Sequence, residues 1–374
     1  HLNVPSLETR RGIPSSLSKH IVTDILKEQL GFKGLIFTDA LTMKGAADFV
    51  EKSVDGNTSK KMITGGEIDL AAFLAGNDVM LMSATPKGAI AKFVDAYNNG
   101  DISEERLAHS VKKILQAKYK VGLDHYKPIG TRNLVADLNR IKDDVLYEEL
   151  FENAITIAKN KPGLLPLRQL ETKSIAYVKL GDDKGGAFFK ELQKYARVHE
   201  VKAEKLDELL EKLKPYNTVI VGLHRSNANP WKSYKFTDKE LVWLYEIART
   251  NTVILDVFVK PYVLLDLNSV TNIESVIVSY QNSEIAQQKS AQIIFGAIPS
   301  KGTLPVSAGE YFKVGQGEQH SAISRLSYTI PERVGMSSSL LKVVDSIANH
   351  AVNGGMTPGI QLLIARKGKV IYNK

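Results

Sequence analysis

The sequence has no cysteine among its 374 residues. This absence excludes disulfides, thiolate nucleophiles and zinc sites built on cysteine, and it is compatible with an oxidising envelope compartment, where a stray thiol is a liability. No uninterrupted apolar run approaches the roughly 20 residues that cross a bilayer, so we expect no membrane-spanning segment. The sequence also lacks a His-Glu-x-x-His motif, an Asp-rich calcium loop and a Gly-rich phosphate loop. We therefore expect neither a metal site nor a cofactor.

The charge of the chain is basic but dispersed. The formal net charge is +8 at pH 7, and Lys and Arg are interleaved with Asp and Glu along the whole sequence. Because no compact basic run with aromatic residues occurs, we expect no nucleic-acid partner. Hydrophobic residues make up 43% and charged residues 24%, which is the balance of a globular protein. The length predicts two or three domains, and the sequence leaves the oligomeric state open.

The first 120 residues alternate predicted helices with short apolar strands. Such alternation predicts a parallel sheet covered by helices, and short, continuous apolar runs are typical of strands buried on both faces. A (β/α)8 barrel needs eight such units in about 250 residues. We therefore expect residues 1–120 to be the C-terminal part of a barrel. The predicted elements are helices over 18–30 and 67–75, strands over 35–37 and 79–82, and a helix that begins after the N-cap Ser103.

A second α/β region follows a predicted linker. Residues 121–145 contain Gly122, Pro128 and Gly130 and are typical of a connection rather than a packed element. Residues 146–330 alternate Val- and Ile-rich runs with helical stretches, which predicts an open, doubly wound α/β sandwich. Its expected strands span residues 174–180, 218–223, 252–259 and 275–279.

The pattern changes once more in residues 331–374. A predicted helix over 338–353 is followed by a strand over 360–365 and a hairpin turn at 366–369. The sequence stops inside this hairpin, and an isolated hairpin is not stable by itself. We therefore expect this region to be the truncated start of a further domain.

Asp39 is the main candidate for chemistry. It follows the predicted strand 35–37, and catalytic groups of barrels lie at the carboxyl ends of their strands. Judged by position alone, an N-cap for the next helix is an equally good interpretation. The surrounding segment GFKGLIFTDALTMKG, residues 31–45, resembles the nucleophile segment of glycoside hydrolase family 3, with Asp39 at the nucleophilic aspartate. β-Glucosidases of the family usually have Trp after this Asp, whereas residues 40–43, ALTM, resemble the β-N-acetylhexosaminidase branch.

The resemblance implies a retaining exo-β-N-acetylhexosaminidase that hydrolyses terminal amino-sugar glycosides of the cell-wall type. Its partner would be a carbohydrate and its location the periplasm or cell envelope. Asp39 would attack the anomeric carbon to give a covalent glycosyl-enzyme intermediate, while a second group protonates the leaving oxygen. In this branch the general acid/base is usually a His in an Asp-x-His loop, which the sequence lacks. We therefore expect the acid/base to lie outside the chain and residues 1–374 alone to be inactive.

Two further residues are candidates for substrate binding. The segment HLNVPSLE resembles the end of the family's sixth barrel strand and the loop after it, which would make His1 a pocket residue. A structural terminal residue is an equally good interpretation of His1. Met43 lies in the segment that resembles the hexosaminidase branch. His224 follows a predicted strand at the carboxyl edge of a sheet, where ligands often bind, but a solvated loop is the better interpretation there.

Other segments extend the resemblance to about residue 330. Residues 154–167 resemble the start of the family's α/β sandwich, and residues 280–307 resemble its end. Residues 334–372 resemble the opening of a serine β-lactamase-like domain, in which Ser-x-x-Lys supplies the nucleophile. The three matches to that spacing are expected to be accidental: Ser16 with Lys19, Ser110 with Lys113, and Ser339 with Lys342.

Three alternative functions remain open from the sequence. The first is a β-glucosidase-type member of the same family. The second is serine hydrolase or amidase chemistry from the β-lactamase-like region. The third is a catalytically inactive binding protein that has kept the fold.

Overall fold

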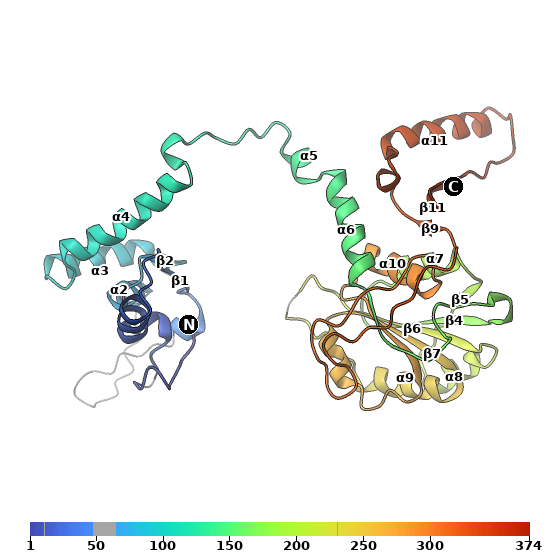
Figure 1. Ribbon diagram of the computed structural model, residues 1–374, viewed down its shortest axis with the longest axis horizontal. Helices are drawn as coiled ribbons and strands as arrows, with labels where there is room; N and C mark the ends of the chain where they lie inside the picture. The colour runs from blue at the N-terminus through green and yellow to red at the C-terminus, as the bar shows by residue number, and fades with distance from the viewer. Residues whose placement is uncertain (11, 48–64, 230) are drawn as a thin grey trace. The chain divides into compact units, whose positions relative to one another are not determined.

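The computed structural model describes residues 1–10, 12–47, 65–229 and 231–374. The chain divides into two compact units, residues 1–131 and residues 132–374 (Figure 1). No helix in the described ranges is long and apolar enough to cross a membrane.

The first unit combines a pair of parallel strands with helices, as predicted. Ala40 of the first strand lies opposite Leu81 of the second. The predicted cap is confirmed, because the Ser103 hydroxyl accepts a hydrogen bond from the Arg106 amide at 3.1 Å. The elements are η1 (Ser15–Leu17), η2 (His20–Gln29), β1 (Phe37–Ala40), α1 (Lys44–Ala47), α2 (Gly65–Ala75), β2 (Val79–Leu81), α3 (Pro86–Asn98), α4 (Glu104–Lys120) and η3 (Leu123–His125).

The burial of β1 and β2 differs from the prediction. Thr38 is buried, but the preceding Phe37 is 57% exposed, and Leu81 of β2 is 44% exposed. Side chains of a strand alternate between two faces, and the apolar clusters of the described residues include Met80 but neither Phe37 nor Leu81. The expectation of strands buried on both faces is therefore wrong for this unit. Strand β1 also begins at Phe37, later than predicted, and it includes Asp39.

A buried carboxylate fixes helix α4 to the amino ends of the strands. Asp78 accepts hydrogen bonds from the Lys113 ammonium at 2.6 Å, the Ser110 hydroxyl at 2.5 Å and the Ile36 amide at 3.0 Å. Burial by itself raises the pKa of Asp78, but the bonds from Lys113 and Ser110 outweigh it, and the pKa is lowered. These contacts give the Ser110 and Lys113 pair a structural role.

The second unit is built on a six-stranded mixed sheet with strand order β3-β8-β7-β6-β4-β5. Neighbouring strands are parallel except for the edge pair β3 and β8. The four predicted strands are confirmed as β4, β6, β7 and β8, whereas the short edge strands β3 and β5 were missed. The elements up to the last helix of the sandwich are α5 (Leu134–Leu138), α6 (Ile141–Ala154), β3 (Thr156–Asn160), η4 (Leu170–Thr172), β4 (Ile175–Leu180), α7 (Gly186–Gln193), β5 (Val198–Glu200), α8 (Leu206–Leu213), β6 (Thr218–His224), α9 (Asp238–Thr250), β7 (Thr252–Phe258), η5 (Pro261–Asp266), β8 (Ile273–Val278) and α10 (Glu284–Ile294).

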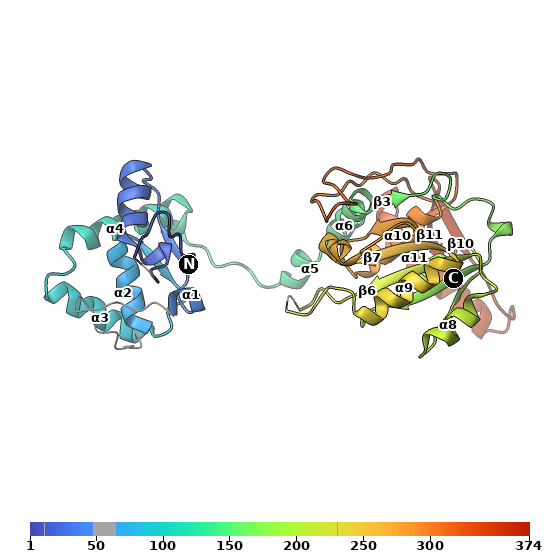
Figure 2. The ribbon, with the colours of Figure 1, turned by 90° about the horizontal axis from the view of Figure 1, so that it is seen from below.

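Helices cover both faces of this sheet, so its strands are buried on both sides. Ala176 and Val178 of β4 belong to the apolar cluster that includes α8 and α9. Ile175 and Tyr177 belong to the opposite cluster, which includes α6, α7 and α10. Figure 1 shows the sheet between these two layers of helices, and Figure 2 looks onto the face that α8 and α9 cover. The predicted α/β sandwich is confirmed for this unit.

The range 121–145, predicted as a linker, is partly helical. Helix α5 lies within it, and α6 begins at Ile141. The division between the two units falls after Thr131. Phe151 of α6 is buried in the core between the sheet and helices α7 and α10. Packing of α6 against this core therefore decides where the connection ends, and the Gly and Pro content of residues 121–145 does not.

The predicted helix and hairpin after residue 330 are confirmed. Strand β11 pairs antiparallel with β10 and parallel with the short strand β9, where Lys369 lies opposite Ser327. The hairpin is thereby attached to the second unit, while α11 has no buried residue. The domain boundary at residue 330 stays a prediction. The elements here are β9 (Ser327–Tyr328), η6 (Pro331–Val334), α11 (Ser338–Asn353), β10 (Leu363–Arg366) and β11 (Lys369–Asn373).

A buried charge cluster connects α6, α10 and η6 in this unit. The Lys289 ammonium lies 3.0 Å from Glu148 and 2.9 Å from Glu152, and its side chain is 1% exposed. Arg333 of η6 pairs with the same two carboxylates. The cluster holds two cations against two anions, so each buried charge has a partner.

Candidate active site

Asp39 lies in β1 with its side chain on the exposed face of the strand. The preceding Thr38 points to the buried face, where its hydroxyl accepts a hydrogen bond from the Leu81 amide at 2.9 Å. The Asp39 carboxylate accepts a hydrogen bond from the Ala40 amide at 2.7 Å. Helix α1 begins only at Lys44, so the alternative interpretation of Asp39 as a helix N-cap does not hold. Asp39 is an accessible carboxylate on a strand that pairs with β2 and whose neighbouring residue, Thr38, is hydrogen-bonded to β2.

The other two predicted site residues, His1 and Met43, both contact the carbonyl oxygen of Ala40. The oxygen accepts a hydrogen bond from the Met43 amide at 3.0 Å. The Nε2 atom of His1 also lies 3.0 Å from this oxygen, and the Nδ1 atom of the same ring is hydrogen-bonded to the Ser16 hydroxyl. The structure therefore brings Asp39, His1 and Met43 together around one peptide segment.

These contacts bear on the predicted substrate-binding roles of His1 and Met43. Both ring nitrogens of His1 are engaged by protein atoms, and the Met43 side chain is 47% exposed. Substrate binding stays a prediction for both residues. Sequence reasoning missed Ala40 and Ser16, because a main-chain carbonyl and a hydroxyl at this spacing leave no recognisable pattern.

Gly45 permits the close approach of the first residue to helix α1. A Cβ atom at this position would lie 2.8 Å from the His1 carbonyl oxygen, closer than atoms of real side chains approach. A larger residue would push the two segments apart. The glycine at the end of the motif therefore has a packing reason at this site.

An apolar groove of about 520 Å³ lies elsewhere in the first unit, along α3. Its polar end is formed by Asp69, whose carboxylate accepts a hydrogen bond from the Ser83 hydroxyl at 3.0 Å. Burial raises the pKa of Asp69. The remaining lining is almost entirely apolar, so the groove offers few groups that could bind a sugar: Met80, Pro86, Ala89, Ile90, Phe93, Val94, Tyr97, Ile102 and Leu107.

His224 of the second unit is not in a solvated loop. It is the last residue of β6, is fully buried, and stacks on the Phe258 ring at a centroid distance of 4.5 Å. Its Nε2 atom is 2.8 Å from the Tyr177 hydroxyl and its Nδ1 atom is 2.7 Å from the Asn282 side-chain oxygen. Burial lowers the pKa of His224 to about 4. The residue is part of the core, and the expectation of a solvated loop is wrong there.

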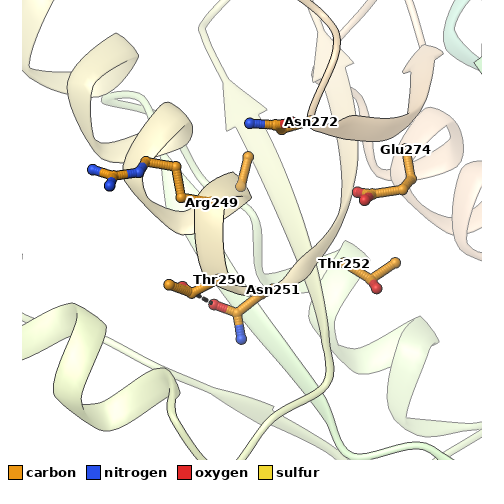
Figure 3. Close-up of a pocket in the computed structure, with 7 residues that line it drawn as sticks. Arg249, Thr250, Asn251, Thr252, Asn272 and Glu274 are labelled. Carbon is orange, nitrogen blue, oxygen red and sulfur yellow. Dashed lines mark hydrogen bonds between the residues drawn. The ribbon is translucent and has the colours of Figure 1, made fainter.

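A polar depression of about 510 Å³ lies at the amino ends of β7 and β8 (Figure 3). Its charged groups already have protein partners. Arg249 pairs with Glu246 at 2.9 Å, and Glu274 accepts a hydrogen bond from the Val253 amide at 2.8 Å. We assign no chemistry to this depression. Among the described residues, no group of three or more His, Asp or Glu side chains is placed to hold a metal ion.

Comparison with known proteins supports the resemblance of the Asp39 region. Residues 1–117 match the glycosyl hydrolase family 3 N terminal domain. The β-N-acetylglucosaminidase/β-glucosidase of Cellulomonas fimi is 25% identical to this chain over 163 residues, which are 44% of the chain and 27% of the relative. β-Hexosaminidase A of Pseudoalteromonas piscicida is 28% identical over 189 residues, which are 45% of the chain and 28% of the relative. The match thus spans less than a third of either relative.

Solved structures support the fold of both units. A glycoside hydrolase family 3 β-N-acetylglucosaminidase from Paenibacillus sp. str. FPU-7 superposes with a TM-score of 0.57 at 21% identity, covering 80% of this chain and 56% of the other. At this identity the likeness shows the α/β fold alone. Other sequence relatives are named β-xylosidase and β-glucosidase, so the relatives do not share one substrate.

Proposed function

We propose that the protein is a retaining exo-β-N-acetylhexosaminidase that releases terminal amino sugars from cell-wall-type glycosides. The observation that carries the proposal is the accessible Asp39 carboxylate at the carboxyl end of β1, within the residues that match the family domain. Relatives named for N-acetylglucosaminidase and hexosaminidase activity support the amino-sugar assignment. A β-glucosidase is the second candidate, because other relatives carry that name.

We assign the two oxygens of Asp39 different roles. The Ala40 amide holds Oδ1, which orients the carboxylate, and we assign Oδ2 to the attack on the anomeric carbon. Attack forms a bond from Oδ2 to the sugar and breaks the bond to the leaving oxygen, which takes up a proton from the acid/base. Water then hydrolyses the glycosyl-enzyme and regenerates the carboxylate. No residue of this chain is assigned as the acid/base.

Covalent trapping tests the role of Asp39. A 5-fluoro N-acetylglucosaminyl fluoride needs little help from a general acid, because fluoride leaves without prior protonation. We expect peptide mass spectrometry of the treated full-length protein to find one sugar on Asp39 and none in the Asp39→Asn variant. Asp24→Asn, which changes an acidic residue of the same unit whose side chain is 43% exposed, should be labelled as the unsubstituted protein is. A label on another acidic residue that survives in Asp39→Asn would contradict the assignment.

The same experiment separates the two sugar classes. We expect the N-acetylglucosaminyl reagent to label faster than its glucosyl counterpart at equal concentration. Faster labelling by the glucosyl reagent, still at Asp39, would favour the β-glucosidase alternative. It would leave the nucleophile assignment intact.

We also propose a periplasmic or cell-envelope location and a β-lactamase-like region that begins at residue 331. The first follows from the cell-wall type of the proposed substrate, and recovery of the protein in the cytoplasmic fraction would contradict it. Helix α11 followed by the antiparallel pair β10 and β11 supports the second. We expect Ser339 to be accidental in its spacing to Lys342, so a penicillin label lost in Ser339→Ala would contradict that expectation.

A further inference from the structure

We propose that His1 is a positioning residue for Asp39 and acts through the peptide groups of Ala40. This inference rests on the proposed role of Asp39 as the nucleophile. It assigns the His1 ring to the protein and not to the sugar.

The partners of His1 define its protonation pattern. A main-chain carbonyl oxygen can only accept a hydrogen bond. Because Nε2 of His1 lies 3.0 Å from the Ala40 carbonyl oxygen, Nε2 carries the proton. In the neutral ring Nδ1 then accepts from the Ser16 hydroxyl, with which it is paired. Two contacts on opposite sides of the ring fix its orientation.

Ala40 connects the fixed His1 ring to the Asp39 carboxylate, because it is hydrogen-bonded to both. Its amide donates to the Asp39 carboxylate at 2.7 Å, and its carbonyl accepts from both His1 and the Met43 amide. The next amide, that of Leu41, donates to the Leu81 carbonyl at 3.0 Å. The end of β1 is thus held by β2 on one side and by His1 on the other, and rotation of the Ala40 peptide groups would move the donor that orients Asp39.

A nucleophile needs this accuracy. Attack on the anomeric carbon requires an approach of roughly 3–3.5 Å, and a misplacement of about 1 Å can cost about a hundredfold in rate. Both ring nitrogens of His1 are engaged by protein atoms, so loss of this contact would allow the end of β1 to shift without removing a free polar group of the ring. The expected signature is a slower covalent step at nearly unchanged affinity.

Nuclear magnetic resonance tests the contact independently of catalysis. In the 374-residue chain labelled with ¹⁵N histidine, we expect His1 to show a single tautomer with the proton on Nε2. The exposed His109 of α4 should show the averaged signals of a solvated ring. Averaged signals for His1 as well would overturn the proposal.

Trapping kinetics with the fluorinated sugar test the consequence. We expect the His1→Ala variant to lower the first-order labelling rate at saturating reagent about 10- to 100-fold, with less than a threefold change in the half-saturating concentration. His1→Gln, whose amide nitrogen can reach the same carbonyl, should recover most of the rate. His109→Ala is the control and should change neither quantity.

The outcomes separate the two proposals. An unchanged rate in His1→Ala, or a loss confined to affinity, would overturn the positioning role while Asp39 is still labelled in the unsubstituted protein. If the unsubstituted protein forms no label on Asp39, the proposed function fails. In that case the NMR result alone tests the contact between His1 and Ala40. A single tautomer with the proton on Nε2 would support the contact, and averaged signals would contradict it.

Discussion

Short apolar runs predicted strands in both units, but the strands that form have different surroundings. All seven residues of β6 in the second unit are buried, whereas β1 of the first unit alternates between buried and exposed positions. Both strands have only parallel neighbours, so the direction of pairing does not decide burial. The difference is that helices cover both faces of the six-stranded sheet, while among the described residues of the first unit the apolar clusters include only one face of the pair. A short apolar run therefore indicates a strand, and the surrounding elements decide how much of it is buried.

The largest expected effect concerns the buried charge cluster of the second unit. Lys289→Met would leave Glu148 and Glu152 sharing the single cation Arg333, and loss of one partner of a buried pair typically costs about 3–5 kcal/mol. Both tryptophans of the protein, Trp231 and Trp243, lie in this unit. Their fluorescence during urea unfolding therefore measures its free energy of unfolding.

A matched lysine and a counterpart in the first unit sharpen this result. Lys212→Met removes an exposed pair with Glu208 and should change the free energy of unfolding by no more than about 1 kcal/mol. Lys113→Met leaves Asp78 with the Ser110 hydroxyl, the Ile36 amide and Arg106 at 3.7 Å, so we expect a loss of about 1–3 kcal/mol. The rate of hydrogen exchange at the Ile36 amide, which donates to Asp78, would measure this loss of stability in the first unit. A Lys289→Met variant as stable as Lys212→Met would contradict the importance of the cluster.

Two leucines in the middle of helices give the most direct comparison of the units. Leu244 of α9 is fully buried, whereas Leu115 of α4 is 58% exposed. Leu244→Ala should cost about 2–5 kcal/mol through lost contacts and a cavity, and Leu115→Ala should cost less than about 0.5 kcal/mol. Tryptophan fluorescence reports the first variant and circular dichroism the second. If Leu115→Ala were as costly as Leu244→Ala, the outer face of α4 would have to be covered in the folded protein.

The remaining expected effects are opposite pH dependences within the second unit. Burial raises the pKa of Asp256 to about 7, although hydroxyls of Ser279 and Ser290 donate to it. The folded state then holds a proton that the unfolded state releases above pH 3.8, so the contribution of Asp256 to stability is complete below that pH and is lost as the pH rises to about 7.

His224 acts in the other direction. Its pKa falls from 6.5 to about 4 on folding, so its contribution is complete above pH 6.5 and is lost as the pH falls toward 4. We expect the two contributions to oppose each other between pH 4 and 6.5. Asp256→Asn should make the protein lose stability more steeply on acidification, and His224→Gln less steeply, each by at most about 1.4 kcal/mol per pH unit. Urea unfolding at several pH values measures both slopes, and equal slopes in all three proteins would contradict the two assignments.

Local sequence determined several features of this protein because each depends on neighbouring residues. The Val- and Ile-rich runs of β4, β6, β7 and β8 and the Ser103 cap of α4 were predictable from composition and spacing. The segment around Asp39 also carried enough specific residues to indicate the family domain that residues 1–117 match and to suggest a candidate nucleophile. Edge strands β3 and β5 were not predicted, because their sequences, TIAKN and VHE, contain few apolar residues.

Only the tertiary structure decided the contacts between distant residues. His1 reaches Ala40 across 39 positions and Lys289 reaches Glu148 across 141. Neither contact has a periodicity that a local pattern could reveal. Burial is likewise a property of the whole unit. His224 is the last residue of β6, a position that often faces solvent, yet the rings of Tyr177, Phe188 and Phe258 pack around it. Local chemistry selects helix and strand, and packing between remote segments decides which side chains are held, buried or exposed.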